Sequence, residues 1–298
     1  MAEGTLPAAG ELMTALGPVG YTAAGRGPVA VLLHGNPGDA RDWDAVVDVL
    51  AERRTVVRLD WPGYGRSSHL DDGATVDAPG LARVLDDVLD GIGRAVGGRL
   101  GQVVLIGHSV GGYTAAYQAL ARPDRVAAVV LVAPGGFTRF TWLTRTFVRT
   151  MGSVGPARLL AGPLASAYTV RRTPTSRAAL RRVRSMRGNP DRLTVHSAVW
   201  RSFLDPAHDL RHIASTITVP VLLTWGRLDP VVPWRSAGRR AARLLPRAQV
   251  ARFWSGHLPH AEVPQRWLGA VVPFLDAVAP PPCAEASAPG PDGANADG

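Results

Sequence analysis

The sequence predicts an α/β fold in which a doubly wound, mostly parallel sheet is covered by helices on both faces. Short runs of apolar, β-branched residues recur along the chain, and their apolarity is continuous rather than alternating, which is typical of strands buried on both faces. Segments with the apolar spacing of helices separate these runs. Strands that alternate with helices in this way form parallel sheets.

Six runs have the length and composition of strands, and Gly, Pro or Asp residues bound them. The expected strands are, in chain order, Val29–Leu33, Thr55–Leu59, Gln102–Ile106, Val126–Val132, Val219–Trp225 and Gln249–Trp254.

Helices are expected between these strands. The clearest begins after Asp77 and ends at Gly97, and its apolar residues recur at i, i+3, i+4 and i+7 from Leu81 to Val96. Three further segments have helical patterns: Gly111–Ala121, Arg235–Leu245 and Gln265–Val278.

The stretch from 136 to 211 interrupts this alternation, because it contains no clear strand. Its 14 arginines and three acidic residues give it a net charge of +11, whereas the rest of the chain is at −2. We predict a core formed by residues 1–135 and 212–278, with a helical, arginine-rich insertion at 136–211 that follows the strand at 126–132. Residues 279–298 have almost no apolar bulk and are expected to be disordered.

Composition excludes several classes of chemistry. The 298 residues include no lysine, so no Schiff base can form, and the single cysteine, Cys283, allows neither an internal disulfide nor a thiolate metal site. We expect no cofactor and no metal. No run of 18 apolar residues indicates a transmembrane helix, and the first 17 residues lack the pattern of a secretory signal, so a cytoplasmic location is expected.

The net charge is +9, and all 33 basic residues are arginine. The missing lysine, together with 33 glycines, 25 prolines and abundant alanine, indicates the codon bias of a GC-rich genome. For the arginines of the insertion three readings stay open: a solvated face, a site for acidic groups of a substrate, or attraction to anionic lipid surfaces. No nucleic-acid partner is expected, because no recognition motif accompanies the charge. The expected partner is a small-molecule substrate, and the oligomeric state is left open.

A G-x-S-x-G motif at 107–111 lies between an expected strand and an expected helix. The tight turn between them forces Ser109 into a strained backbone conformation and exposes its hydroxyl. Gly107 and Gly111 are needed because side chains there would collide as strand and helix approach. The amide of Val110 then lies at a helix N-terminus, where it can donate to an oxyanion.

A serine hydroxyl needs a base, and the base needs an acid that orients it. Two histidines, His257 and His260, follow the last expected strand, and Asp229 follows the strand before it. Catalytic groups collect at the carboxyl ends of parallel strands, where these residues and Ser109 are all expected. A His-Gly turn at His34 can direct a second amide, that of Asn36, toward the same oxyanion.

Taken together, these residues resemble the α/β-hydrolase superfamily, in particular its capped esterase, epoxide-hydrolase-like and C–C hydrolase branch. Five ordered motifs carry the resemblance over about residues 17–278: HGNPG at 34–38, DWPGYGRS at 60–67, GHSVG at 107–111, WGRLDPVVP at 225–233 and GHLPHAEVP at 256–264.

The resemblance implies Ser109 as nucleophile, Asp229 as acid and His257, rather than His260, as base. It also implies that the basic insertion is a helical cap over the site. Epoxide hydrolases and haloalkane dehalogenases have aspartate at the nucleophile position, so Ser109 favours acyl transfer to water instead. Asp205 and Asp209 are alternative acids, because the superfamily sometimes moves the acid between strands.

Other prominent residues are assigned structural roles. We expect His108 to pack at the interface of sheet and cap, His34 to brace the oxyanion turn, and Asp60 to cap backbone amides. Trp43 and Trp225 are expected in the core.

The sequence therefore predicts a serine hydrolase that cleaves a carboxylic ester of a small to medium organic substrate. A C–C bond hydrolase, a thioesterase or a cofactor-free perhydrolase with the same triad is the alternative. A third possibility is a non-catalytic ligand-binding protein on a hydrolase scaffold.

Overall fold

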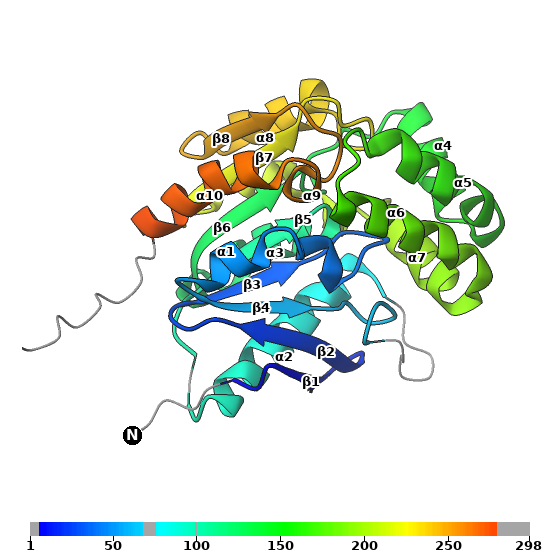
Figure 1. The fold of residues 1–298 in the computed structure, drawn as a ribbon. Coiled ribbons are helices and arrows are strands. Elements are labelled where there is room, and N and C mark those ends of the chain that lie inside the picture. Colours follow the sequence, from blue (N-terminus) through cyan, green and yellow to red (C-terminus); the bar gives the residue numbers. More distant parts are fainter. Residues whose placement is uncertain (1–5, 68–75, 99, 279–298) are drawn as a thin grey trace, which may run out of the picture.

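An eight-stranded sheet forms the centre of the computed structural model, which describes residues 6–67, 76–98 and 100–278 (Figure 1). The strand order is β1-β2-β4-β3-β5-β6-β7-β8. β1 and β2 pair antiparallel with each other, and β2 pairs antiparallel with β4, whereas all pairs from β4 to β8 are parallel. The predicted doubly wound, mostly parallel sheet is confirmed.

The six predicted strands correspond to β3–β8, and two further strands precede them. The bounds are β1 Ala9–Thr14, β2 Gly17–Ala24, β3 Val29–Leu33, β4 Thr55–Leu59, β5 Val103–His108, β6 Val126–Val132, β7 Val221–Gly226 and β8 Gln249–Phe253. The first two were missed because they lack a continuous apolar run: β1 is nowhere fully buried, and Gly and Pro interrupt β2.

Side chains of β3 show why the parallel strands are apolar throughout. Val31 and Leu33 point to one face of the sheet, which helices α2 (Ala78–Ala95) and α3 (Val110–Ala121) cover. Ala30 and Leu32 point to the other face, which α1 (Val47–Ala51) and α10 (Pro264–Val278) cover. Both faces are therefore buried. Trp43 and Trp225 are fully buried core residues, as expected.

Four helices lie between β6 and β7: α4 Trp142–Met151, α5 Val154–Tyr168, α6 Pro174–Ser185 and α7 Pro190–Ser202. Figure 1 shows them together beyond the carboxyl ends of β3 and β4. They pack around a separate apolar cluster that contains Met151, Ala165, Leu180, Val183 and Leu193. These helices fall within the predicted insertion; its exact boundaries stay a prediction, and the predicted tail with Cys283 lies outside the described residues.

Short helices complete the chain: η1 Ala40–Trp43, η2 Pro123–Arg125, η3 Met186–Gly188, η4 Pro206–His208, η5 Leu210–His212, η6 Ala214–Thr216, η7 Trp234–Gly238, α8 Arg239–Leu244 and α9 Pro259–Glu262. The helix predicted at 235–245 is thus divided between η7, a turn of π-helix, and α8. Within the described ranges, no helix combines the length and the apolarity that crossing a bilayer requires.

An ion cluster connects α6 to the core beside η1. The Arg182 guanidinium lies 3.2 Å from Asp39 Oδ2 and 2.5 Å from Asp42 Oδ1. Both carboxylates are buried, and burial raises the pKa of Asp42 to about 6 against the attraction of Arg182. The packing of α6 on the core therefore depends on the positive charge of Arg182, which both buried carboxylates contact.

We predict that Arg182→Ala lowers the free energy of unfolding by about 3 kcal/mol, because it leaves buried carboxylates without this counter-charge. The matched control is Arg181→Ala, whose guanidinium is exposed and should contribute no more than about 0.5 kcal/mol. Urea unfolding of both variants measures the difference. Equal stability of the two variants would show that the cluster does not hold α6 in place.

Candidate active site

Ser109 occupies a strained turn between β5 and α3. Its φ of 54° and ψ of −112° lie in a region that residues with a side chain rarely adopt. A Cβ at Gly107 would overlap the carbonyl oxygen of Gly111, and a Cβ at Gly111 would overlap that of Leu33. Strand and helix approach as closely as they do because both flanking residues are glycine.

Asp229 and His257 form a buried hydrogen-bonded pair. His257 Nδ1 lies 2.6 Å from Asp229 Oδ2, and Asp229 Oδ1 accepts hydrogen bonds from the amides of Val231 at 2.8 Å and Val232 at 3.0 Å. Both oxygens of the carboxylate are therefore engaged, which fixes its orientation. A carboxylate at Nδ1 holds the proton there and leaves Nε2 as the ring nitrogen that can accept one.

Ser109 and His257 line the same small cavity, about 20 Å³ in volume, together with Asn36. The structure thus brings together three residues that lie far apart in the sequence. The fourth residue, Asp229, lies behind His257 and contacts it directly.

A second carboxylate, Glu262 of α9, holds the loop that carries His257. It accepts hydrogen bonds from the amides on either side of the histidine, those of Gly256 at 3.0 Å and Leu258 at 3.2 Å. The amide of His257 itself donates to the carbonyl oxygen of Tyr168 at 2.9 Å. The backbone of the histidine is therefore tied at three consecutive residues.

Glu262 also reaches the segment between α5 and α6. Its Oε2 accepts hydrogen bonds from the amides of Val170 at 2.9 Å and Arg171 at 2.8 Å. Burial raises the pKa of this carboxyl, while the four amides act in the opposite direction. Sequence reasoning missed this role, although Glu262 lies inside the GHLPHAEVP motif.

Asn36 is held from two sides by residues that the sequence did not single out. Its Oδ1 accepts hydrogen bonds from Tyr64 Oη at 2.7 Å and His196 Nδ1 at 2.8 Å, and its Nδ2 donates to the carbonyl oxygen of His196 at 3.1 Å. These bonds fix the turn after β3 beside Ser109. His196 belongs to α7, so the helical insertion contributes directly to the geometry of the turn.

The amides of Asn36 and Val110 are the predicted oxyanion donors. Val110 is the first residue of α3, and the first amides of a helix have no acceptor within the helix. Gly35 packs against Ser109, since a Cβ at Gly35 would lie 3.1 Å from Ser109 Cβ. The turn that carries the Asn36 amide is therefore adjacent to the serine.

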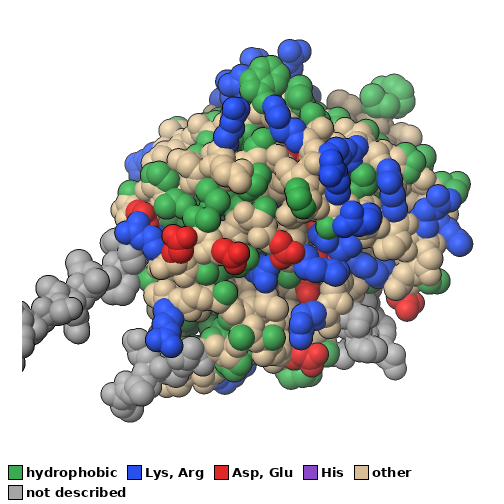
Figure 2. Space-filling view, in the orientation of Figure 1, with side chains coloured by type: hydrophobic (Ala, Val, Ile, Leu, Met, Phe, Trp, Pro, Cys, Tyr) green, Lys and Arg blue, Asp and Glu red, His purple; other side chains and the backbone are tan. Residues whose placement is uncertain are grey.

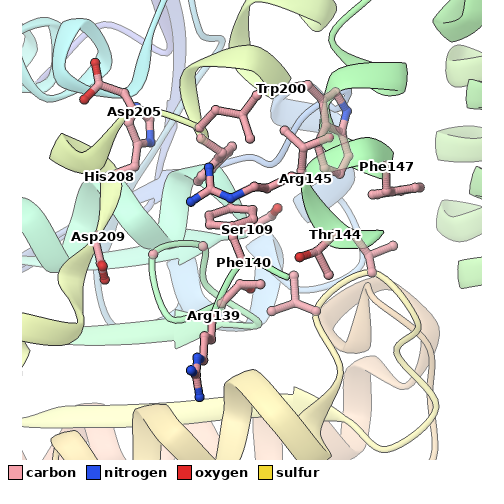
Figure 3. Close-up of a pocket in the computed structure, with 18 of the residues that line it drawn as sticks. Ser109, Arg139, Phe140, Thr144, Arg145, Phe147, Trp200, Asp205, His208 and Asp209 are labelled. Carbon is pink, nitrogen blue, oxygen red and sulfur yellow. The ribbon is translucent and has the colours of Figure 1, made fainter. Parts of the chain in front are cut away.

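A larger cavity of about 360 Å³ extends from Ser109 between the core and the helical insertion (Figure 3). Aromatic and aliphatic side chains form much of its wall, including Phe140, Trp200 and Phe203. Figure 3 shows Arg145 extending into the cavity toward Phe140, and its guanidinium carbon lies 5.7 Å from the centre of that ring. Such a cavity can accommodate a small organic molecule.

The alternative acids are engaged elsewhere. Asp209 forms a bidentate pair with Arg211, at 2.7 and 2.5 Å, and Asp205 caps the amide of Ala207 at 2.9 Å. Within the described residues no group of three or more His, Cys, Asp or Glu side chains is placed to hold a metal ion.

A model of the α/β hydrolase fold family matches residues 28–264. The chain belongs to this family. One relative of this α/β hydrolase is a 2-hydroxy-6-oxononadienedioate/2-hydroxy-6-oxononatrienedioate hydrolase of Burkholderia vietnamiensis, which is 30% identical over 86% of this chain and 90% of its own. A pimeloyl-[acyl-carrier protein] methyl ester esterase of Vibrio campbellii is 29% identical over 80% of this chain and 91% of its own.

Among solved structures, a thermophilic esterase of Thermogutta terrifontis superposes with a TM-score of 0.73 at 21% identity, over 91% of this α/β hydrolase and 99% of that chain. This likeness shows the shared fold. Family membership and the hydrolases among the relatives support a hydrolase activity.

Buried histidines surround the site of this α/β hydrolase without being placed for catalysis. His34 Nδ1 donates to the Gly35 carbonyl oxygen at 2.8 Å, and its Nε2 accepts from the Trp61 amide at 2.9 Å, which braces the turn as expected. His108 donates to the carbonyl oxygen of His257 at 3.0 Å. Asp60, also as expected, accepts hydrogen bonds from backbone amides, those of Ala40 at 2.7 Å and Arg66 at 2.9 Å.

Burial lowers the pKa of these histidines. The pKa falls to about 3 for His196 and His260 and to about 4 for His208, and it is also lowered for His34 and His108. Desolvation is the main cause, because it penalises the charged imidazolium. Between these values and 6.5, the unfolded chain binds more protons than the folded one, so stability rises with pH. Asp42 and Glu262, whose pKa values are raised by burial, act in the opposite direction, but they are two groups against five.

We therefore predict that stability falls as the pH drops from about 7 to about 5, by up to about 1.4 kcal/mol per pH unit for each buried histidine. His260→Phe should flatten this dependence, because His260 stacks on Trp43 at 4.1 Å and has no hydrogen-bond partner among the described residues. The exposed His212→Gln is the control. Urea midpoints across this range measure the effect, and unchanged stability at about pH 5 would contradict it.

Proposed function

We propose that this α/β hydrolase is a serine hydrolase that cleaves a carboxylic ester through an acyl-enzyme on Ser109. The observation that carries the proposal is the 2.6 Å hydrogen bond between His257 and Asp229, with the histidine and Ser109 on one cavity. The strained conformation of Ser109 supports it, because strain of this kind persists at functional sites where the surrounding structure enforces it.

In the first half of the reaction, His257 Nε2 takes the proton of Ser109 as Oγ attacks the carbonyl carbon of the ester. Asp229 stabilises the imidazolium that forms and keeps its ring oriented. The amides of Asn36 and Val110 donate to the oxyanion, and one such donor is worth about 10²–10³ in turnover. The C–O bond then breaks, and the alcohol leaves with the proton that His257 returns.

In the second half, water replaces the alcohol. His257 takes a proton from the water as its oxygen attacks the acyl-enzyme, the same amides hold the second oxyanion, and Ser109 leaves with the returned proton. His257 thus acts as base and then as acid in each half, so its ring is uncharged at the start of each half and positively charged while it holds the proton. Apart from the ester and the attacking water, each half uses only groups of this chain.

The larger cavity supports a small to medium organic ester as substrate. Its volume of about 360 Å³ and its aromatic walls fit an apolar acyl or alcohol group. Arg139 and Arg145 also line it, and within the described part of the chain no ion pair involves either side chain. An ester that carries a second, anionic group is therefore compatible with the cavity.

A second candidate is hydrolysis of a C–C bond by the same residues. It is favoured by the relative from Burkholderia vietnamiensis, whose name describes a hydrolase of a dienedioate. A panel of acyl esters, thioesters and vinylogous diketones distinguishes the bond types. A higher kcat/KM for the diketones than for the esters would replace our first proposal with this one.

We predict that Ser109→Ala abolishes hydrolysis of a short p-nitrophenyl ester and labelling by a fluorophosphonate, since the nucleophilic oxygen is removed. Loss of about 10⁶ in turnover is expected for such a residue. Thermal unfolding checks that the variant is folded. Undiminished hydrolysis in a folded variant would refute the assignment, and labelling without turnover in the wild-type protein would instead favour a ligand-binding protein on a hydrolase scaffold.

The acid is tested separately. Asp229→Asn should lower turnover by about 10⁴, because an amide favours the wrong tautomer of His257. The matched comparisons are Asp205→Asn and Asp209→Asn, the two alternative acids. A loss of this size in either of them, combined with an active Asp229→Asn variant, would move the acid to the other residue.

A further inference from the structure

Helices α4 and α5 expose large apolar side chains. Trp142 and Leu143 in the first turn of α4 are 79% and 62% exposed, and Leu159 of α5 is 60% exposed. The two helices follow each other along the chain and contact each other. The exposed set, which we call the α4–α5 surface, consists of Trp142, Leu143, Val154, Leu159 and Leu160.

Arginines are interspersed with these apolar residues. Arg149 lies on α4, and Arg158 precedes Leu159 on α5; both are exposed. Within the described ranges no ion pair neutralises either of them. The sequence has no acidic residue between Asp124 and Asp191, so no carboxylate of this stretch opposes their charge. Figure 2 shows arginines gathered over the part of the molecule where Figure 1 places the four helices of the insertion.

We propose that the α4–α5 surface binds an anionic phospholipid membrane from the aqueous side. Tryptophan and leucine enter the boundary of headgroups and acyl chains, while neighbouring arginines pair with lipid phosphates. A solvated face would not need three apolar side chains exposed by 60% or more. The positive charge without an adjacent acid selects an anionic surface over a neutral one.

The opposite side of α4 faces the site. Thr144, Arg145 and Val148 of this helix line the 360 Å³ cavity that contains Ser109. A membrane bound at Trp142 and Leu143 would therefore lie one helix away from the cavity. That the enzyme would take its ester from such a membrane rests on the proposed function, whereas binding itself does not.

The test is co-flotation with vesicles of phosphatidylcholine alone or mixed with phosphatidylglycerol. We expect the wild-type protein and Ser109→Ala to bind the mixed vesicles equally and at least about tenfold more tightly than the neutral ones. The double variant Trp142→Gln/Leu143→Gln should bind about tenfold more weakly. Arg149→Gln/Arg158→Gln should lose about tenfold at low salt and less at high salt, where its charges are screened.

Matched controls are Met13→Gln, which changes a 70% exposed apolar residue on β1 at the far edge of the sheet, and the exposed Arg247→Gln. Both should bind like the wild type. Thermal unfolding verifies that each variant is folded.

No binding to the mixed vesicles, or equal losses in the control variants, would overturn the proposal. Retention on immobilised polyglutamate without vesicle binding would also overturn the proposal, because it would indicate that the partner of this surface is an acidic polypeptide. Because Ser109→Ala is included, failure of vesicle binding and failure of catalysis are separate results.

Discussion

The arrangement of the site depends on the parallel pairing of neighbouring strands. β7 and β8 pair in register from Leu222 with Gln249 to Gly226 with Phe253, so the segments that follow them leave the sheet at the same edge. Asp229 and His257 lie just beyond these strand ends and meet at 2.6 Å. β3 and β5 pair in the same way, and they place the turns of Asn36 and Ser109 side by side. Four distant residues converge because four strands end together.

The helical insertion participates in this site. Its segment between α5 and α6 donates two amides to Glu262, which also holds the amides that flank His257. His196 of α7 holds the side chain of Asn36. A shift of the insertion would therefore disturb both His257, the proposed base, and the turn of Asn36, the proposed oxyanion donor. The Arg182 cluster beside η1 resists such a shift from a third position.

The charge of the insertion has different consequences on its different sides. Toward the core, Arg182 is neutralised by buried carboxylates, and toward the cavity, Arg211 is paired with Asp209. On the outer side of α4 and α5, arginines alternate with exposed apolar residues. The net charge of the chain, +9, does not distinguish the paired arginines from the exposed ones. Whether an arginine stabilises the fold or is available to bind a partner depends on the groups around it.

The sequence by itself determined the sheet, six of its strands, and the motifs that carry Ser109, Asp229 and His257, because buried parallel strands need continuous apolar runs and a strand-to-helix elbow needs glycine at fixed positions. It did not show β1, whose edge position removes the apolar signal, or β2, in which Gly and Pro interrupt the apolar run. Only the tertiary structure decided that Glu262 and His196 support the site, and which arginines are neutralised. Those contacts join residues up to 160 positions apart, and local patterns carry no information about such distances.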